Sequence, residues 1–533
     1  MSLRRDWQVR AAAWEWPEAI VEDADALVLQ ETLTGSCVGV RYVARPWAAA
    51  GVCEMLADLP EHLLHSVCYH LDGASLARLG QASLTLKTVA QSAAEQLLAS
   101  RCHHAGNWRM CARVGEAPAY QLFVLEELLP ATQQVVSTAT AHALVVSAGG
   151  KLVAFGDDSL RQLGLGGSDA PTQESVWGRL KSMHSTAQPV RYLDDRPVMS
   201  VAAGQAHSCC IALLSDGTPA LFTWGSCSAS RGATGHEPPE FQESWPPGFV
   251  IPAPRLLRKH VALVAAGHLH TACISVQGEV FTWGRGAHGR LGHGDDEDRP
   301  RPSLVETLPG RTIALDCGMD TTAVVTHDGR LLVAGTMYVD GQFDSFHDPT
   351  LIRFPESAAA VRQVSCGQRH FAAIDAAGAL YTWGYGAGGR LGHGSDVSVG
   401  APRQLRGMGH QEVDPQGRRT MSSRVTAVSC GSDFTAAICK GSLWSWGANT
   451  SGSLGHNDCH RRTVPTRVCM DHLSDGVAAA TVVAVCCGRD SCVTVLASGE
   501  LVSFGNGDKG QSGRPNAGSW RPGVVGDVEC AAM

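Results

Sequence analysis

The sequence predicts a mainly β repeat protein that follows a small helical domain, and three observations support this. One set of landmarks recurs seven times after residue 135. Within each copy, apolar residues alternate with period 2, which indicates short, half-buried strands. Residues 55–100, by contrast, contain few glycines and show helical spacing.

The repeat is clearest in residues 361–394, which contain a β-branched run, a Cys-Gly pair, a His, an aromatic run ending in Trp-Gly, and a Gly-rich turn. Successive aromatic-Gly glycines lie between 49 residues (335 to 384) and 69 residues (156 to 225) apart, which is enough for a four-stranded unit with variable loops. The fourth copy is degenerate and keeps few landmarks. The seven pairs are Phe155-Gly156, Trp224-Gly225, Trp283-Gly284, Ala334-Gly335, Trp383-Gly384, Trp446-Gly447 and Phe504-Gly505.

This order of landmarks resembles the regulator of chromosome condensation repeat. The resemblance implies a seven-bladed β-propeller over residues 136–530. A plant ultraviolet-B photoreceptor has the same fold, but its repeated Gly-Trp-Arg-His-Thr pattern is missing here. We therefore interpret the tryptophans as core residues at strand ends, namely Trp224, Trp283, Trp383 and Trp446.

Repeated histidines and cysteines occupy equivalent points in several copies, so they are spread around the repeat array instead of converging on one site. We interpret the histidines as core residues that bridge neighbouring strands. The cysteines alternate with Ala203 and Ala266 at one position, which indicates a small buried core site. No zinc-ligand spacing or phosphate-binding glycine motif occurs, so we predict no catalytic residue, metal or cofactor. The residues are His142, His207, His270 and His370, with Cys317, Cys366, Cys430 and Cys487.

Charge and hydropathy exclude several function classes. The chain has 43 basic and 51 acidic residues, a net charge of −8, which argues against binding to nucleic acid or an anionic membrane. No apolar run reaches the roughly 18 to 20 residues of a membrane helix, and the first residues lack a secretory signal. We expect a cytoplasmic and/or nuclear protein with reduced thiols.

Residues 55–100 predict three short helices, between an unassigned segment (1–54) and a helical linker (101–135). Pro60 suits a first helical turn, Gly73 a left-handed cap and Ser75 the start of a second helix. This Leu-Pro start with its leucine pattern resembles the F-box, the module by which substrate receptors dock on the Skp adaptor of cullin-based ubiquitin ligases. The resemblance assigns adaptor binding to Leu59, Pro60, Leu63, Leu64, Val67, Leu71 and Leu76.

The F-box resemblance leaves an alternative open. The tryptophan expected near residues 97–100 is absent, and the alternative is that the leucines form only the inner face of a helical cap on the propeller.

Long segments between repeat landmarks are candidate binding loops, because loops on a rigid scaffold commonly carry specificity. They are Gly166–Arg196, Ser226–Lys259 and Gly407–Arg424. The second is Pro-rich and carries Phe241, Trp245 and Phe249, which fit a target-binding segment or a solvated insertion equally well.

Two function classes follow from the resemblances. In the first, the chain is the substrate-recognition subunit of a Skp–cullin–F-box ubiquitin ligase, and the propeller binds an unknown target protein. In the second, it is a guanine-nucleotide exchange factor or scaffold for a Ran-like small GTPase. Residues 55–100 favour the first, because only that class explains them. In neither function class does this chain itself make or break a covalent bond.

The C-terminal segment also resembles the start of another copy, since residues 522–530 read PGVVGDVEC where residues 364–366 read VSC. We expect this tail to pair beside the first copy and so close the ring of blades.

Overall fold

The computed structural model divides the chain into two compact units, Met1–Glu126 and Glu127–Met533. The structure describes residues 28–34, 37–43, 134–165, 183–214, 219–226, 232–235, 251–252, 261–408, 410–413, 419–422, 424–473, 481–514 and 519–529. In the first unit these form one antiparallel hairpin of β1 (Val28–Thr34) and β2 (Cys37–Val43), which the sequence analysis did not anticipate. The predicted F-box residues lie outside the described residues. The proposed division of residues 1–135 therefore stays a prediction.

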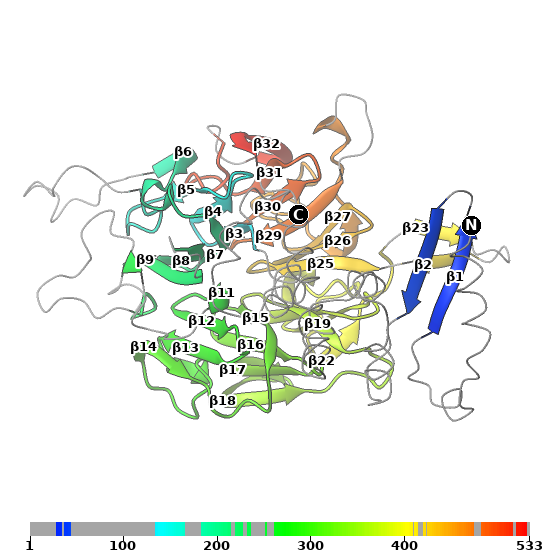
Figure 1. Ribbon diagram of the computed structural model, residues 1–533, viewed down its shortest axis with the longest axis horizontal. Helices are drawn as coiled ribbons and strands as arrows, with labels where there is room; N and C mark the ends of the chain where they lie inside the picture. Colours follow the sequence, from blue (N-terminus) through cyan, green and yellow to red (C-terminus); the bar gives the residue numbers. More distant parts are fainter. Residues whose placement is uncertain are drawn as a thin grey trace, which may run out of the picture. The chain divides into compact units, whose positions relative to one another are not determined.

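The second unit is a seven-bladed β-propeller in which each blade consists of four antiparallel strands in chain order (Figure 1). Blades 1 to 3 contain β3 (Val136–Thr138), β4 (His142–Val146), β5 (Leu152–Asp157) and β6 (Met183–Pro189); β7 (Val198–Ala203), β8 (His207–Leu213), β9 (Pro219–Gly225) and β10 (Ile251–Pro252); β11 (Val261–Ala266), β12 (His270–Ser275), β13 (Val280–Gly284) and β14 (Arg299–Leu304). Blade 4 contains β15 (Thr312–Cys317), β16 (Thr321–Thr326), β17 (Leu331–Val339) and β18 (Gln342–Ile352).

The remaining strands are β19 (Val361–Cys366), β20 (His370–Asp375), β21 (Leu380–Gly384) and β22 (Val399–Gln404) in blade 5; β25 (Val425–Cys430), β26 (Phe434–Cys439), β27 (Ser442–Gly447) and β28 (Arg462–Arg467) in blade 6; β29 (Val482–Cys487), β30 (Ser491–Leu496), β31 (Glu500–Gly505) and β32 (Ser519–Glu529) in blade 7. A separate hairpin, β23 (His410–Val413) with β24 (Arg419–Ser422), lies between blades 5 and 6 in the chain. Short 3-10 helices are η4 (Arg191–Leu193), η5 (Ala287–Gly289), η6 (Ala387–Gly389) and η7 (Asp471–Leu473). None of the helices in the described part of the chain has the length and apolar character of a membrane crossing.

The inner strands lie where the sequence predicts strands, but they are fully buried and not half-buried as predicted, and their side chains form the core. Strands β12, β16, β20, β26 and β30 are buried along their whole length, because each is packed between its own blade neighbours and an adjacent blade. The repeated cysteines are buried as predicted, with exposed fractions of 6 to 8%. Burial raises the pKa of all four thiols.

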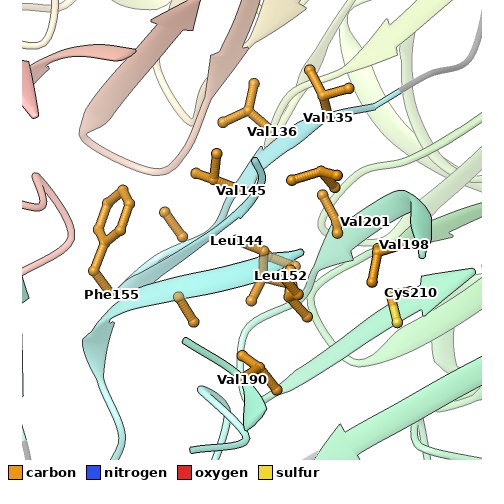
Figure 2. Packing of buried hydrophobic residues seen from close by; sticks show 14 of the residues in the cluster. Val135, Val136, Leu144, Val145, Leu152, Phe155, Val190, Val198, Val201 and Cys210 are labelled. Atoms are coloured by element: carbon orange, nitrogen blue, oxygen red, sulfur yellow. The ribbon is translucent and has the colours of Figure 1, made fainter. Parts of the chain in front are cut away.

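The prediction that the C-terminal tail pairs beside the first copy is wrong. Strand β32 is the outer strand of blade 7 and pairs with β31, while the inner position of blade 1 is already occupied by β3, which pairs with β4. Blades 7 and 1 instead share one apolar cluster, which joins Val525 and Val528 of β32 to Phe155 of β5. Figure 2 shows residues of this cluster from blades 1 and 2, and in Figure 1 the red end of the chain returns to the cyan start of the ring. Packing between blades therefore closes the ring.

The loop prediction for Gly166–Arg196 is also partly wrong, because residues 183–189 form β6. An outer strand touches its blade on one edge only. In β6, Met183, Thr186 and Pro189 are exposed and the other side chains are half-buried, without an apolar period. In the same way, Ser226–Lys259 contributes β10, and Gly407–Arg424 contributes β23 and β24.

The innermost strands are joined by side-chain hydrogen bonds from blade to blade. The amide of Cys430 donates to Ser365 Oγ over 3.0 Å, and the amide of Cys487 donates to Ser429 Oγ over 2.8 Å. At the seam between blades 7 and 1, the amide of Thr138 donates to Cys486 Sγ over 3.4 Å. Blade 4 differs, since a carboxylate accepts instead: Asp316 Oδ2 lies 2.7 Å from the amide nitrogen of Cys366.

Replacement of Asp316 by Ser is expected to stabilise the propeller at neutral pH. Burial raises the pKa of Asp316 to about 6, so the folded state binds a proton more tightly than the unfolded chain and loses that advantage as pH rises from about 4 through 6. Serine keeps the acceptor, as Ser365 does in blade 5, and removes the charge. Asp316→Ser should therefore raise the free energy of unfolding by about 2 kcal/mol more at pH 7.5 than at pH 4.5. Urea unfolding at both pH values measures this, and an equal effect at both would refute it.

Candidate protein-binding face

The repeated histidines bridge neighbouring blades, as predicted. His142 Nε2 lies 2.8 Å from Ser208 Oγ in the next blade, and Ser208 Oγ donates to the carbonyl of Gln162. Because the hydroxyl proton is used in that second bond, the histidine must donate from Nε2. The same relay joins His207 to Thr271, His270 to Thr322 and His370 to Thr435, over 2.8 to 3.0 Å.

These histidines have no catalytic geometry. Each is fully buried, and burial lowers the pKa of His142, His207 and His370 to about 3 and that of His270 well below its usual value. A neutral ring that is packed against an inter-blade hydroxyl reaches no solvent or substrate. Their role is to hold blades together.

One face of the propeller carries the turns between the first and second strands and the loops between the third and fourth strands of each blade. We call it the front face. Here two loop arginines reach into the following blade and pair with a turn aspartate: Arg290 Nη2 lies 2.6 Å from Asp320 Oδ1, and Arg390 Nη1 lies 2.6 Å from Asp433 Oδ1. Both guanidinium groups are buried, with side-chain exposures of 1% and 8%. Such pairs fix loop positions and leave little free charge.

The junction between blades 4 and 5 departs from this arrangement. Blade 4 has no Gly-rich loop, because β17 and β18 continue as a long hairpin that turns at Asp340 and Gly341. Both turn residues have positive φ, 48° and 91°, as a two-residue type I′ turn requires. Without the loop, the Trp383 indole lacks the carbonyl acceptor that Trp283 finds in Ala233.

The hairpin places two aromatic rings against blade 5. The ring centroid of Phe343 lies 5.4 Å from that of Tyr338 and 5.5 Å from that of Tyr385, which follows β21. The guanidinium carbon of Arg369 lies 5.0 Å from the Phe343 centroid. Phe343 is 38% exposed, and Arg369 is exposed as well. We call Tyr338, Phe343, Tyr385 and Arg369 the aromatic–arginine rim.

The rim has the composition of a protein-binding hot spot. Tyr and Arg are enriched in such spots, because they offer large contact area together with directional polar groups. The rim is also rigid, since its hairpin is paired from Leu331↔Ile352 to Val339↔Gln342 with one bulge. It can bind a partner without paying for loop ordering.

The site residues predicted from the sequence cannot be compared with this surface, because none of them is among the residues that the structure describes. Phe241, Trp245 and Phe249 lie outside the described residues, as do the adaptor-binding residues Leu59 to Leu76, so both assignments stay predictions. The rim was missed because it lies in the degenerate fourth copy. The Asp340-Gly341 pair, flanked by Tyr338 and Phe343, is a strong hairpin signal that would have found it.

The described residues form a seven-bladed β-propeller, and among them no group of three or more His, Cys, Asp or Glu side chains could hold a metal ion. Residues 221–532 match the RCC1-like domain (WD40_RLD), so the chain belongs to the RCC1-like domain family.

Named relatives include the "E3 ubiquitin-protein ligase HERC2" of Mus musculus, which is 30% identical over 328 residues, or 58% of this chain and 6% of that protein. The "Ultraviolet-B receptor UVR8" of Arabidopsis thaliana is 30% identical over 261 residues, or 48% of this chain and 55% of the receptor. The chain thus spans 6% and 55% of the lengths of these relatives.

Two solved structures share the fold. Human WBSCR16 has a TM-score of 0.56 at 24% identity and covers 68% of this chain and 86% of its own. Prp20p from Saccharomyces cerevisiae, described with its binding properties to Gsp1p and histones, has a TM-score of 0.52 at 18% identity and covers 67% of this chain and 81% of its own. At these identities the likeness concerns the fold alone.

Proposed function

We propose that the chain is the substrate-recognition subunit of a Skp–cullin–F-box ubiquitin ligase and that the front face of the propeller binds the target protein. Residues 55–100, for which the sequence predicts helices, dock on the Skp adaptor, and the cullin assembly supplies the chemistry. The chain contributes proximity and no covalent step of its own. It acts in the cytoplasm, the nucleus or both.

The observation that carries this proposal is the aromatic–arginine rim, a rigid surface suited to a protein partner. Two further points support it. Relatives that are 30% identical to this chain are described as E3 ubiquitin-protein ligases, which supports a role in ubiquitin transfer. The leucine pattern of residues 59–76 explains how this chain would join a cullin assembly.

The alternative is an exchange factor or scaffold for a Ran-like GTPase. The chain's acidic balance, the blade 4 hairpin in place of a loop and the 18% identity to Prp20p give it no added support. Affinity purification of the full chain with mass spectrometry separates the two: co-purified Skp and cullin support the receptor. A co-purified GTPase whose fluorescent GDP analogue is released at least about tenfold faster with the chain present supports the exchange factor.

Replacement of Leu59 and Pro60 by Ala is expected to weaken adaptor binding by roughly thirty- to a thousand-fold, or about 2 to 4 kcal/mol, if both act as interface hot spots. Calorimetry with purified Skp adaptor measures this for the full chain. Leu304→Ala, at a leucine of β14 that is 40% exposed, is the control and should bind like wild type. Absence of wild-type binding at about 50 micromolar would favour the helical-cap interpretation.

A further inference from the structure

We propose that the aromatic–arginine rim recognises an acidic segment of the target protein, with Arg369 pairing with its carboxylate. This inference rests on the proposed function and names the chemical class of its partner. It follows from the charge that the rim presents, the pairing of the surrounding groups and the shape of the blade 4 hairpin.

Arg369 reverses the charge found at its position in neighbouring blades. The last residue of the turn between the first and second strands is Asp320 in blade 4, Asp433 in blade 6 and Asp490 in blade 7, but Arg369 in blade 5. The aspartates of blades 4 and 6 receive an arginine from the preceding blade. Blade 4 has a hairpin in place of this loop, so no charged loop side chain of blade 4 pairs with Arg369 in blade 5.

Other charged side chains near the rim are Arg390, in the loop after β21, and Asp340 and Asp344, on the blade 4 hairpin. Arg390, whose guanidinium carbon lies 5.3 Å from the Tyr385 centroid, is buried and paired with Asp433. On the hairpin, Asp344 accepts a hydrogen bond from Gln342 Nε2 over 3.1 Å. Among the described residues, no carboxylate forms an ion pair with Arg369, and its contact is with the Phe343 ring. Arg369 is thus an exposed cation that is open to a ligand.

The geometry favours a carboxylate next to an apolar side chain. A guanidinium held against an aromatic ring keeps its outer edge free for two parallel hydrogen bonds to a carboxylate. The exposed part of Phe343 and the half-buried rings of Tyr338 and Tyr385 offer apolar area beside it. The chain's net charge of −8 opposes an acidic ligand only weakly, because charges beyond roughly 8 Å are screened at physiological salt.

The test is a peptide selection with the full chain, using a random 12-residue peptide library displayed on phage as the probe. Binders should be enriched in Asp and Glu. Synthetic versions are then titrated by fluorescence anisotropy. Arg369→Glu should weaken them at least tenfold, whereas Arg362→Glu, a control at an exposed arginine near the other end of β19, should change affinity less than twofold. Melting temperatures verify that each variant is folded.

A charge swap makes the test specific for direct pairing. Peptides in which the acidic residues are replaced by Lys should regain affinity for the Arg369→Glu protein, which a merely structural role of Arg369 would not produce. A selection that yields no binders, binders without acidic enrichment, or binders that a folded Arg369→Glu protein holds as tightly as wild type overturns the inference.

The inference and the proposed function fail in different ways. If Skp and cullin co-purify and a target is ubiquitinated equally by wild type and the folded Arg369→Glu variant, the receptor role stands and the acidic-segment inference is overturned. If neither subunit co-purifies, the proposed function fails, while acidic peptides that lose affinity with Arg369→Glu still support the binding chemistry.

Discussion

Removal of residues 518–533 is expected to lower the melting temperature of the propeller by roughly 10 °C or more. The deletion takes away β32 and, with it, Val525 and Val528, which are 1% and 7% exposed in the cluster shared by blades 7 and 1. Each buried valine contributes about 1.5 to 3 kcal/mol, and the deletion also leaves β31 as an unpaired edge. The melting temperature is therefore expected to fall because packing between blades 7 and 1 is lost, and not because a strand of blade 1 is lost.

Two point variants isolate the packing contribution. Val525→Ala should lower the free energy of unfolding by about 2 kcal/mol, because it removes buried methyl groups at the seam. Val524→Ala, on the same strand but 41% exposed, should have little effect and is the matched control. Differential scanning fluorimetry and urea unfolding measure both, and an unchanged melt for the truncated chain would show that the ring closes without β32.

The inner strands could be predicted because similar contacts between neighbouring blades recur in several copies of the repeat. A histidine that reaches a hydroxyl in the next blade recurs in blades 1, 2, 3 and 5, and a glycine lets its ring approach in blades 2, 3 and 5. The ideal Cβ of Gly204 would lie 2.3 Å from the His207 ring, so only glycine fits there. Repetition in the sequence thus reports repetition of contacts, and the bridging role of His207 follows from it.

The outer strands could not be predicted in the same way. Strand β6 is half-buried on both faces and reads MHSTAQP, with no alternation to recognise. The valines of the C-terminal tail correctly indicated a strand, but a strand pattern does not name its partner. The tail pairs with β31 because β3 already occupies the inner position of blade 1. Strand β3 consists of only three residues, Val136–Thr138, which show too short a pattern to be recognised in the sequence.

The aromatic–arginine rim illustrates why surfaces are harder than cores. Its residues come from two copies: Tyr338 and Phe343 flank the turn of a degenerate repeat, and Arg369 occupies a position that is Asp in three other blades. None of these departures is informative alone. Tyr338 and Phe343 lie close to Arg369 because the blade 4 hairpin is long. When the repeats are compared, this hairpin appears only as a copy in which the usual landmarks are missing.

Acidification is expected to destabilise the propeller steeply between pH 6.5 and 5. His142, His207 and His370 have pKa values lowered to about 3 by burial, and that of His270 is also lowered, so the folded state keeps these rings neutral while the unfolded chain binds a proton to each below about pH 6.5. The stability they provide is complete above that pH and is lost as pH falls towards 3. Each of the three rings whose pKa is lowered to about 3 costs about 2 kcal/mol by pH 5, so together they approach the whole stability of a marginal domain, and His270 acts in the same direction. The raised pKa of Asp316 acts in the opposite direction but is a single group.

His370→Gln tests this mechanism, because glutamine can donate to Thr435 yet does not titrate. The variant should be less stable than wild type at pH 7.5, and the difference in unfolding free energy should shift in its favour by about 2 kcal/mol between pH 6.5 and 5.0. His460→Gln, at an exposed histidine of blade 6 whose side chain is 80% accessible, is the matched control and should follow the wild-type curve. Urea titrations at half-unit pH steps measure the three curves. Parallel curves for wild type and His370→Gln would mean that the buried ring does not stay neutral in the folded state, and the inter-blade relay would then require a charged donor.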